Sequence, residues 1–284
     1  MAETAHTVAV VADPADFARM RGYAGFASTG HRGYLRRMER HLRGLAAGGG
    51  ETWLALFDPA EYAAYCARAG LDPDRPASRA RYTGELAGRG ATVRYDGHGL
   101  RPVLPALLAE AGKERLHELG SGLLDAAGQC PGCGRPHSTC AFERAAAVLA
   151  GMLRRCGPGR HHVVCSVRVA GHHLTAALPA TIEGGQMVCR EEPDALLMCT
   201  VLAAGLAAGA PGGLVLRSAP GPGGHAGEQV RGWRLETGRI EPLSEGEVFA
   251  AYCTDPVTGE PVPPEAGVRH LPGWALPPHH CGPG

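Results

Sequence analysis

The sequence contains no asparagine and only one lysine, Lys113, among its 28 basic residues. Because Glu114 follows that lysine, a Gly-x-x-x-x-Gly-Lys-Ser/Thr phosphate loop is excluded. A Gly-x-Gly-x-x-Gly turn is also missing after the first apolar run of the chain. Two large classes of nucleotide-binding protein are therefore ruled out.

Net charge is lacking as well, since 28 basic residues balance 28 acidic ones. No overall field draws the protein toward nucleic acid or anionic lipid. No apolar run approaches the roughly 20 residues that cross a bilayer, and the first residues lack the basic and apolar regions of a signal peptide. We therefore expect a cytoplasmic protein that has no membrane partner. Its ten cysteines should be thiols or metal ligands.

The first half alternates short apolar runs with helical patterns. Each run ends in an acidic residue: 7–13, 53–58 and 91–96. Helical patterns cover 31–47, 59–69, 78–87 and 104–126. Strands that alternate with helices favour an α/β fold, so we expect a three-layer domain over residues 1–127 with a short, mostly parallel sheet.

The second half has a different order of elements. A helix is predicted over 141–155, a hairpin over 163–178, a helix over 193–208, a strand at 214–216 and a hairpin over 233–240. Ser244 and Glu247 have the spacing of a capping box at the start of a last helix. This order predicts an α+β domain over 142–254 with antiparallel hairpins between helices, followed by a Pro-rich tail over 255–284.

The element order of residues 141–254 resembles that of roadblock and profilin-type modules. The resemblance rests on predicted topology and on no sequence motif. It implies a sheet covered by helices on both faces and a role in protein contacts.

Four residues between the two halves have the spacing of a zinc knuckle, and they define a junction over 128–141. They are Cys130, Cys133, His137 and Cys140. Four such ligands complete a tetrahedron and leave no position for water, so the predicted zinc is structural. A redox Cys-x-x-Cys pair, an iron–sulfur site and ordinary buried thiols are the alternatives. Cys156 or Cys165 could also replace His137 or Cys140 as a ligand.

Asp13, Asp58 and Asp96 each end a predicted strand. The carboxyl ends of parallel strands meet at one edge of a sheet, where these carboxylates could hold magnesium for phosphoryl chemistry. Asp13 and Asp58 are each followed by proline and then an acid, which is also the pattern of a helix cap. Both interpretations stay open.

Two further groups of residues, four histidines and four arginines, are weaker candidates for a functional site. Histidines flank the predicted hairpin and could form a second metal site or an acid/base pair, although surface positions explain them equally well: His161, His162, His172 and His173. Arginines recur at helical spacing and could meet phosphate or simply form a solvated face: Arg32, Arg36, Arg40 and Arg43.

The zinc pattern is structural in type, and no catalytic motif accompanies it. We therefore expect a zinc-stabilised interaction or regulatory protein without catalytic activity, whose partner is a protein. A metal-dependent phosphoesterase or nucleotide-binding enzyme that uses the acidic strand ends is the first alternative. A zinc-dependent nucleic-acid-binding protein is the second, and it is not favoured because the chain has no net charge.

Overall fold

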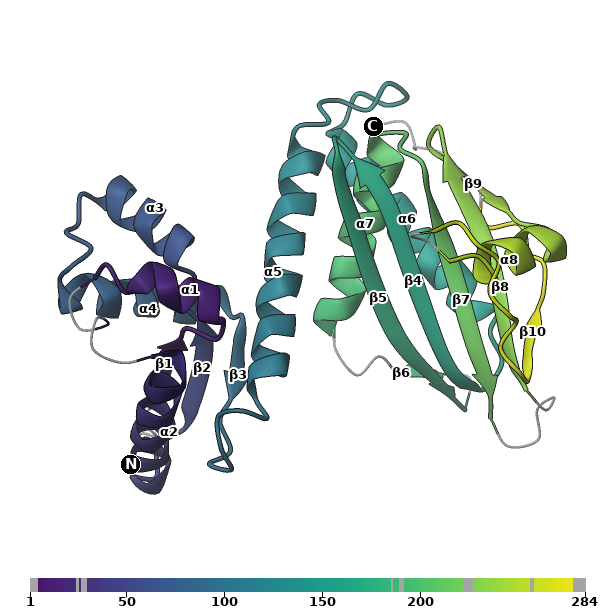
Figure 1. The fold of residues 1–284 in the computed structure, drawn as a ribbon. Helices are drawn as coiled ribbons and strands as arrows, with labels where there is room; N and C mark the ends of the chain where they lie inside the picture. The colour runs from purple at the N-terminus through teal and green to yellow at the C-terminus, as the bar shows by residue number, and fades with distance from the viewer. Residues whose placement is uncertain are drawn as a thin grey trace. The chain divides into compact units, whose positions relative to one another are not determined.

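The computed structural model describes residues 5–23, 26, 30–184, 186–188, 192–221, 227–255 and 258–277. The chain has mixed α/β content and divides into two compact units, Met1–Arg115 and Leu116–Gly284 (Figure 1). The division lies inside one helix, α5 (Leu104–Asp125), so the knuckle belongs entirely to the second unit.

The first unit is built around a small sheet in the order β1-β2-β3. Its elements are β1 (His6–Val10), α1 (Pro14–Met20), α2 (His31–Ala47), β2 (Thr52–Leu56), α3 (Pro59–Ala69), α4 (Pro76–Arg89) and β3 (Thr92–Arg94). Four of the five residues of β2 are buried, which places helices over both sheet faces, and α2 and α4 both contact β1 and β2. The predicted α/β architecture is confirmed.

The direction of β3 differs from the expectation of parallel pairing. β1 and β2 are parallel, with Val8 opposite Leu54, whereas β3 runs antiparallel to β2, with Val93 opposite Leu54. Two helices of similar length, α3 and α4, pack against each other between β2 and β3. A pair of helices returns the chain to the end at which β2 finished, so β3 has to run back.

The second unit contains a larger sheet in the order β10-β8-β7-β4-β5-β6. Its helices and strands are α6 (His137–Arg154), β4 (Gly159–Val169), β5 (His172–Glu183), β6 (Gln186–Val188), α7 (Glu192–Ala207), β7 (Gly212–Pro220), β8 (Glu228–Glu236), β9 (Arg239–Pro242), α8 (Glu245–Tyr252) and β10 (Val268–His270). The β4–β5 and β8–β9 pairs are the two predicted hairpins. The Ser244–Glu247 capping box at α8 is also present.

One face of this sheet carries the core of the unit. Val163, Cys165 and Val167 alternate along β4 with side chains that reach solvent, and each is at most 1% exposed. Helix α7 packs on β4 and β5 and also contacts α6. Because α7 is buried along most of its length, its apolar character reflects the core. No helix within the described residues has both the length and the apolarity that crossing a bilayer requires.

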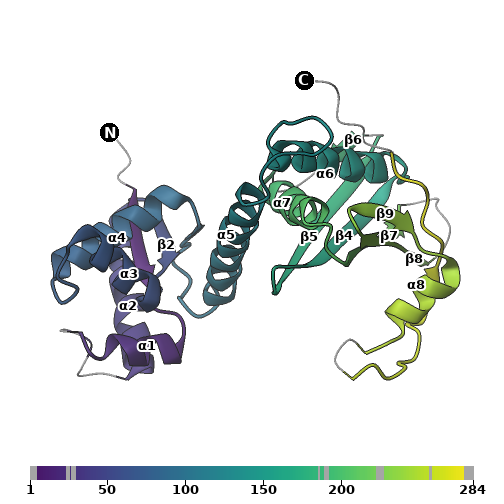
Figure 2. The same ribbon diagram turned by 90° about the horizontal axis from the view of Figure 1, so that it is seen from above.

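The opposite face is covered only in part. Figure 2 shows α6 and α7 on one side of the sheet and α8 on the other, near β8. There, Leu243 and Val248 lie next to Gly232, and Arg234 forms a salt bridge with Glu247. Within the described residues, α8 covers this face at β8 and β10, whereas β4 and β5 present alternate side chains to solvent.

The segment after residue 254, expected to be a tail, contributes to the sheet. β10 pairs in parallel with the first part of β8, while β9 pairs with its last part. Farther on, the backbone carbonyl of Trp274 accepts a hydrogen bond of 2.8 Å from the indole of buried Trp233. The two indole rings meet edge to face at 5.1 Å. These contacts anchor the segment to the unit.

Candidate metal centre

A tight hairpin between α5 and α6 brings two cysteines together. Gln129 and Pro136 form an antiparallel bridge, and Cys130 donates its backbone N–H to the carbonyl of Arg135 at 2.8 Å. The N–H of Gly134 donates a hydrogen bond of 2.8 Å to the Cys130 carbonyl, and Gly134 has a φ of 73°. Glycine adopts this left-handed conformation without the penalty of a side chain, which explains the Gly that follows Cys133.

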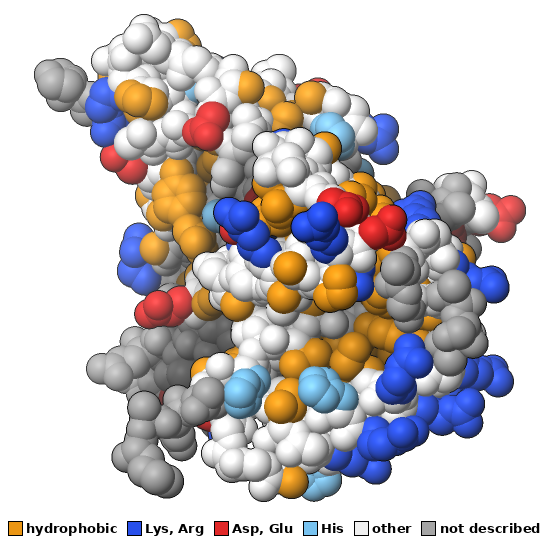
Figure 3. Space-filling view, turned by 90° about the vertical axis from the view of Figure 1, so that its left-hand side faces the viewer, with side chains coloured by type: hydrophobic (Ala, Val, Ile, Leu, Met, Phe, Trp, Pro, Cys, Tyr) orange, Lys and Arg blue, Asp and Glu red, His pale blue; other side chains and the backbone are white. Residues whose placement is uncertain are grey.

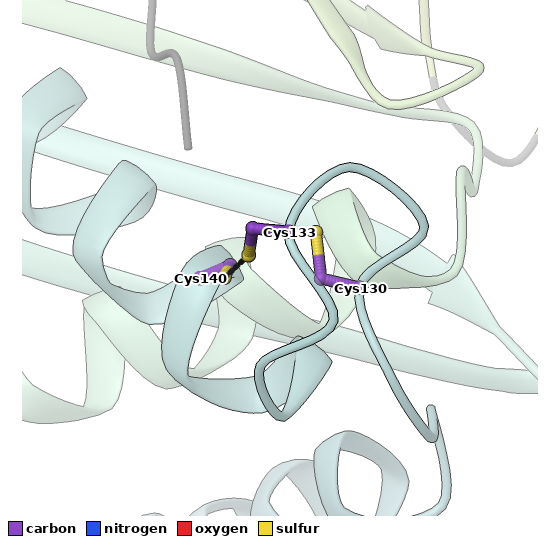
Figure 4. Close-up of side chains that lie close together, drawn as sticks. All are labelled: Cys130, Cys133 and Cys140. Atoms are coloured by element: carbon purple, nitrogen blue, oxygen red, sulfur yellow. Dashed lines mark hydrogen bonds between the residues drawn. The ribbon is translucent and has the colours of Figure 1, made fainter. Parts of the chain in front are cut away.

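The third cysteine comes from the first turn of α6. His137 begins this helix, and its N–H is bonded to the carbonyl of Gly128 at 2.8 Å, which holds the helix start against the hairpin. The sulfur atoms of Cys130, Cys133 and Cys140 then lie within 4.8 Å of one another. Figure 4 shows Cys133 facing Cys140, and their sulfurs are 3.2 Å apart.

The surroundings favour thiolate at one of these positions. A hydrogen bond from the backbone of Arg135, followed by the contact with Cys140, lowers the pKa of the Cys133 thiol to about 6. The guanidinium of Arg135 is itself held by two hydrogen bonds to the Glu143 carboxylate, at 3.0 and 2.8 Å. The Arg135 guanidinium is also hydrogen-bonded to the Cys133 sulfur, while the Glu143 carboxylate balances its charge.

The three sulfurs can hold one metal ion. In a tetrahedral zinc site two sulfurs lie about 3.8 Å apart, because each is about 2.3 Å from the ion. Cys130 and Cys140 are buried, at 7% and 3% exposure, while Cys133 is half-buried. None of the three forms a disulfide, so each sulfur can bind a metal ion as a thiolate. Soft sulfur ligands suit zinc, copper(I) or iron–sulfur clusters and disfavour magnesium or calcium.

Among the described residues, no fourth ligand joins the three cysteine sulfurs. The ring nitrogens of His137 do not lie within 4.8 Å of all three sulfurs, and its role stays a prediction. Cys156 and Cys165 do not join the group either. Burial raises the pKa of Cys156 to about 11 and that of Cys165 to about 12, which keeps both protonated at neutral pH. The structure thus brings together three of the four predicted ligands.

Two of the three acidic strand ends cap helices. Asp13 accepts hydrogen bonds from the N–H groups of Ala15 and Asp16. Asp58 accepts hydrogen bonds from the N–H groups of Ala60 and Glu61 in the first turn of α3. Asp96 accepts from the His98 N–H at 3.0 Å in a loop, and its side chain is 64% exposed. Among the described residues, the carboxylates of Asp13, Asp58 and Asp96 do not gather within 4.8 Å of one another.

The basic helix face is solvated. Arg32, Arg36 and Arg40 are exposed along α2, and Arg43 is paired with Glu39 of the same helix. Figure 3 shows Lys and Arg side chains gathered on one part of the surface in view. Pairing within a helix is the usual arrangement of a solvated face, and contact with phosphate stays a prediction.

The histidines separate into different environments. His161 is buried, and its ring contacts Ser218 and the Gly157 carbonyl. His173 is exposed, and its Nε2 lies 2.7 Å from Ser166 Oγ. No sequence motif points to Ser166. The hairpin predicted over 163–178 turns at 170–171, and this turn sets a register that places Ser166 near His173, so the pairing could have been found from the sequence.

Comparisons with known proteins add little to this geometry. The family model described as "Domain of unknown function (DUF8829)" matches residues 1–98, within the first unit. No curated protein matches the chain. No solved structure matches it either.

Proposed function

We propose that this chain is a zinc-stabilised interaction or regulatory protein without catalytic activity. In this proposal zinc is bound by Cys130, Cys133, Cys140 and His137. The observation that carries it is the cluster of three cysteine sulfurs within 4.8 Å, two of them buried, on a hairpin and a helix start. Soft ligands that close a tetrahedron stabilise structure and leave no position for a substrate.

The place of the cluster supports a structural role for the ion. Cys130 and Cys133 lie in a hairpin held by few hydrogen bonds, and Cys140 lies in the helix that follows. Metal bonds across this turn would fix the start of α6, which carries buried Ala145, Val148 and Met152 of the core. The free energy of binding zinc then adds to the free energy of unfolding.

An interaction role is supported by the sheet of the second unit. β4 and β5 cover the core with one face, and the other face presents alternate side chains to solvent. A metal-stabilised scaffold with an open sheet face suits the binding of a partner. The phosphoesterase alternative is not favoured, because Asp13 and Asp58 each cap a helix through Oδ1 and, among the described residues, the three aspartates do not gather into one group.

The test combines metal analysis with capture of a partner. Protein purified without a tag should carry about one zinc per chain, and Cys130→Ser and Cys133→Ser should lower both zinc content and melting temperature. Wild-type protein should retain a defined partner from its host. Cys156→Ser provides a control, since this half-buried thiol lies outside the cluster. Protein that folds fully without zinc, or hydrolyses phosphate esters in a manner abolished by Asp58→Asn, would contradict the proposal.

A further inference from the structure

We propose that the open face of β4, β5 and β7 binds an acidic segment of a protein partner, with one carboxylate held in a pocket beside Arg168 and His173. This inference rests on the proposed function and names the class of partner. It follows from the order of side chains across the three strands, their charges and the pocket at one end.

The centre of the open face is apolar. Val164 of β4 lies opposite Ala177 of β5 and Val215 of β7, and none of the three is buried. Gly232 of β8 continues this row under α8. The row on one side holds Ser166, Thr175 and Gly213, and the row on the other side holds His162, Pro179 and Arg217. An apolar centre with a polar rim is the usual arrangement of a protein-binding surface.

The charge of the rim is positive. Arg160 and Arg168 lie on this face and form no salt bridge with any described acid. Arg217 is neutralised, because it is paired with Glu228 and Glu265. Glu183 adds one negative charge at the far end of β5. The face therefore complements a segment that carries several carboxylates.

A pocket of about 320 Å³ lies where β7 begins. Its lining consists of Ser166, Val167, Arg168, His173, Pro211 and Gly212. β7 pairs with β4 only as far as Gly212, and the Arg168 N–H is bonded to the Pro211 carbonyl at 3.1 Å. Because β7 begins only at Gly212, an open volume remains beside Arg168 and His173.

Hydrogen bonds position the polar groups of the pocket. Thr175 donates to Ser166 Oγ at 3.3 Å, and Ser166 Oγ lies 2.7 Å from His173 Nε2. This chain fixes the hydroxyl and the ring before any ligand arrives. Residues that line one volume and carry a guanidinium, a hydroxyl and an imidazole suit a carboxylate, which accepts several hydrogen bonds at once.

The absence of aromatic rings argues for a peptide over nucleic acid. The segments of β4, β5 and β7 contain no Phe, Tyr or Trp. Surfaces that bind single-stranded nucleic acid combine basic groups with aromatic rings on which bases stack. An acidic peptide with apolar residues needs no such rings, and the Val164 row offers it an apolar contact.

The test uses the full chain with three dye-labelled probes followed by fluorescence anisotropy. The probes are a peptide of alternating Glu and Val, its Lys and Val counterpart, and an oligothymidine. The Glu peptide should bind, and Arg168→Glu and Arg160→Glu should each weaken binding by about tenfold or more. Arg168→Gln should also weaken it, which guards against misfolding of the charge-reversed variant. Arg32→Glu on α2 is the matched control and should bind like wild type.

Binding of the Glu peptide that is lost with Arg168 and kept in the control supports the proposal. The proposal is overturned by a Glu peptide that does not bind, by equal binding to Arg168→Glu, or by tighter binding of oligothymidine. These failures are distinguishable from failure of the proposed function. A partner captured equally by wild type and Arg168→Glu, with zinc content intact, would leave that function standing and place the partner elsewhere.

Discussion

Gly205 of α7 lies so close to Val167 of β4 that a Cβ atom on the glycine would be 2.6 Å from Val167 Cγ1. The same atom would be 2.8 Å from Leu235 Cδ2 on β8. Val167 and Leu235 are each only 1% exposed, so neither side chain has solvent to move into. The glycine therefore sets the distance between α7 and the sheet.

Gly205→Ala should destabilise the second unit by about 1–3 kcal/mol, the usual cost of an added methyl group in a filled core. The better helix propensity of alanine, worth about 1 kcal/mol, offsets only part of it. Urea denaturation measures the change. Gly122→Ala on α5 is the control, because its Cβ would meet nothing within 4 Å, and it should be neutral or stabilising. Equal stability of both variants would contradict the close packing.

Asp58→Ala should lower the free energy of unfolding by about 1 kcal/mol, because the carboxylate caps α3 with bonds of 2.7 and 3.2 Å. Asp58→Asn should keep most of this stability, since asparagine is also a good cap. Asp96→Ala, which removes no helix cap, should cost less than Asp58→Ala. If Asp58→Asn remained folded but abolished a thermal stabilisation by magnesium seen in wild type, the residue would have a ligand role.

His137→Ala should weaken zinc binding by about tenfold or more. Loss of a residue that only hydrogen-bonds to a metal ligand already costs about tenfold, and loss of a ligand should cost at least as much. Competition with a coloured chelator measures the affinity. Cys156→Ser should bind zinc like wild type, because this thiol lies outside the sulfur cluster. The reverse result, with Cys156 needed and His137 dispensable, would assign the fourth position to the cysteine.

Local signals in the sequence predict the helices well. Helix α3 begins at Pro59 after its Asp58 cap and ends before Gly70, whose φ of 62° is easily adopted only by glycine. These signals act over a few residues and can be read without knowledge of the fold. The β4–β5 hairpin is equally local, because a two-residue turn at 170–171 determines its register.

Pairing between distant segments could not be read from the sequence. β3 is antiparallel because of how α3 and α4 pack, and β10 has three residues in a Pro-rich segment with no strand pattern of its own. At the metal centre the Cys130–Cys133 spacing is local and predicts the turn. The orientation of the His137 ring depends on how α6 packs against the hairpin. The spacing of residues in the sequence does not predict this packing.

Trp274→Ala should destabilise the second unit by about 2 kcal/mol, less than for a fully buried tryptophan because this ring is half-buried. The indole contacts Trp233 and lies 5.1 and 5.0 Å from the guanidinium groups of Arg155 and Arg231. Thermal denaturation measures the loss. Leu271→Ala keeps these ring contacts and serves as a comparison. An unchanged melting temperature for Trp274→Ala would mean that the segment after residue 254 does not stabilise the unit.

The second unit should lose stability as the pH falls below about 6.5, the usual pKa of histidine. His161 should account for part of this loss. Its ring is 5% exposed, with Nδ1 2.9 Å from Ser218 Oγ and Nε2 2.9 Å from the Gly157 carbonyl. The carbonyl can only accept, so Nε2 carries the hydrogen and Nδ1 accepts from the serine. Protonation of Nδ1 would break that second bond.

Burial lowers the pKa of His161 in the folded state, although the bond to Gly157 opposes this effect. Between the lowered pKa and 6.5 the unfolded chain binds a proton that the folded chain does not, so this contribution is complete above 6.5 and declines with falling pH, by at most about 1.4 kcal/mol per pH unit. Urea denaturation at pH 7.5 and 5.5 (both about one unit from 6.5) should show a smaller decline for His161→Gln than for wild type. His162→Gln, at the exposed neighbour, should decline like wild type, and an identical decline in all three proteins would rule out His161 as the group responsible.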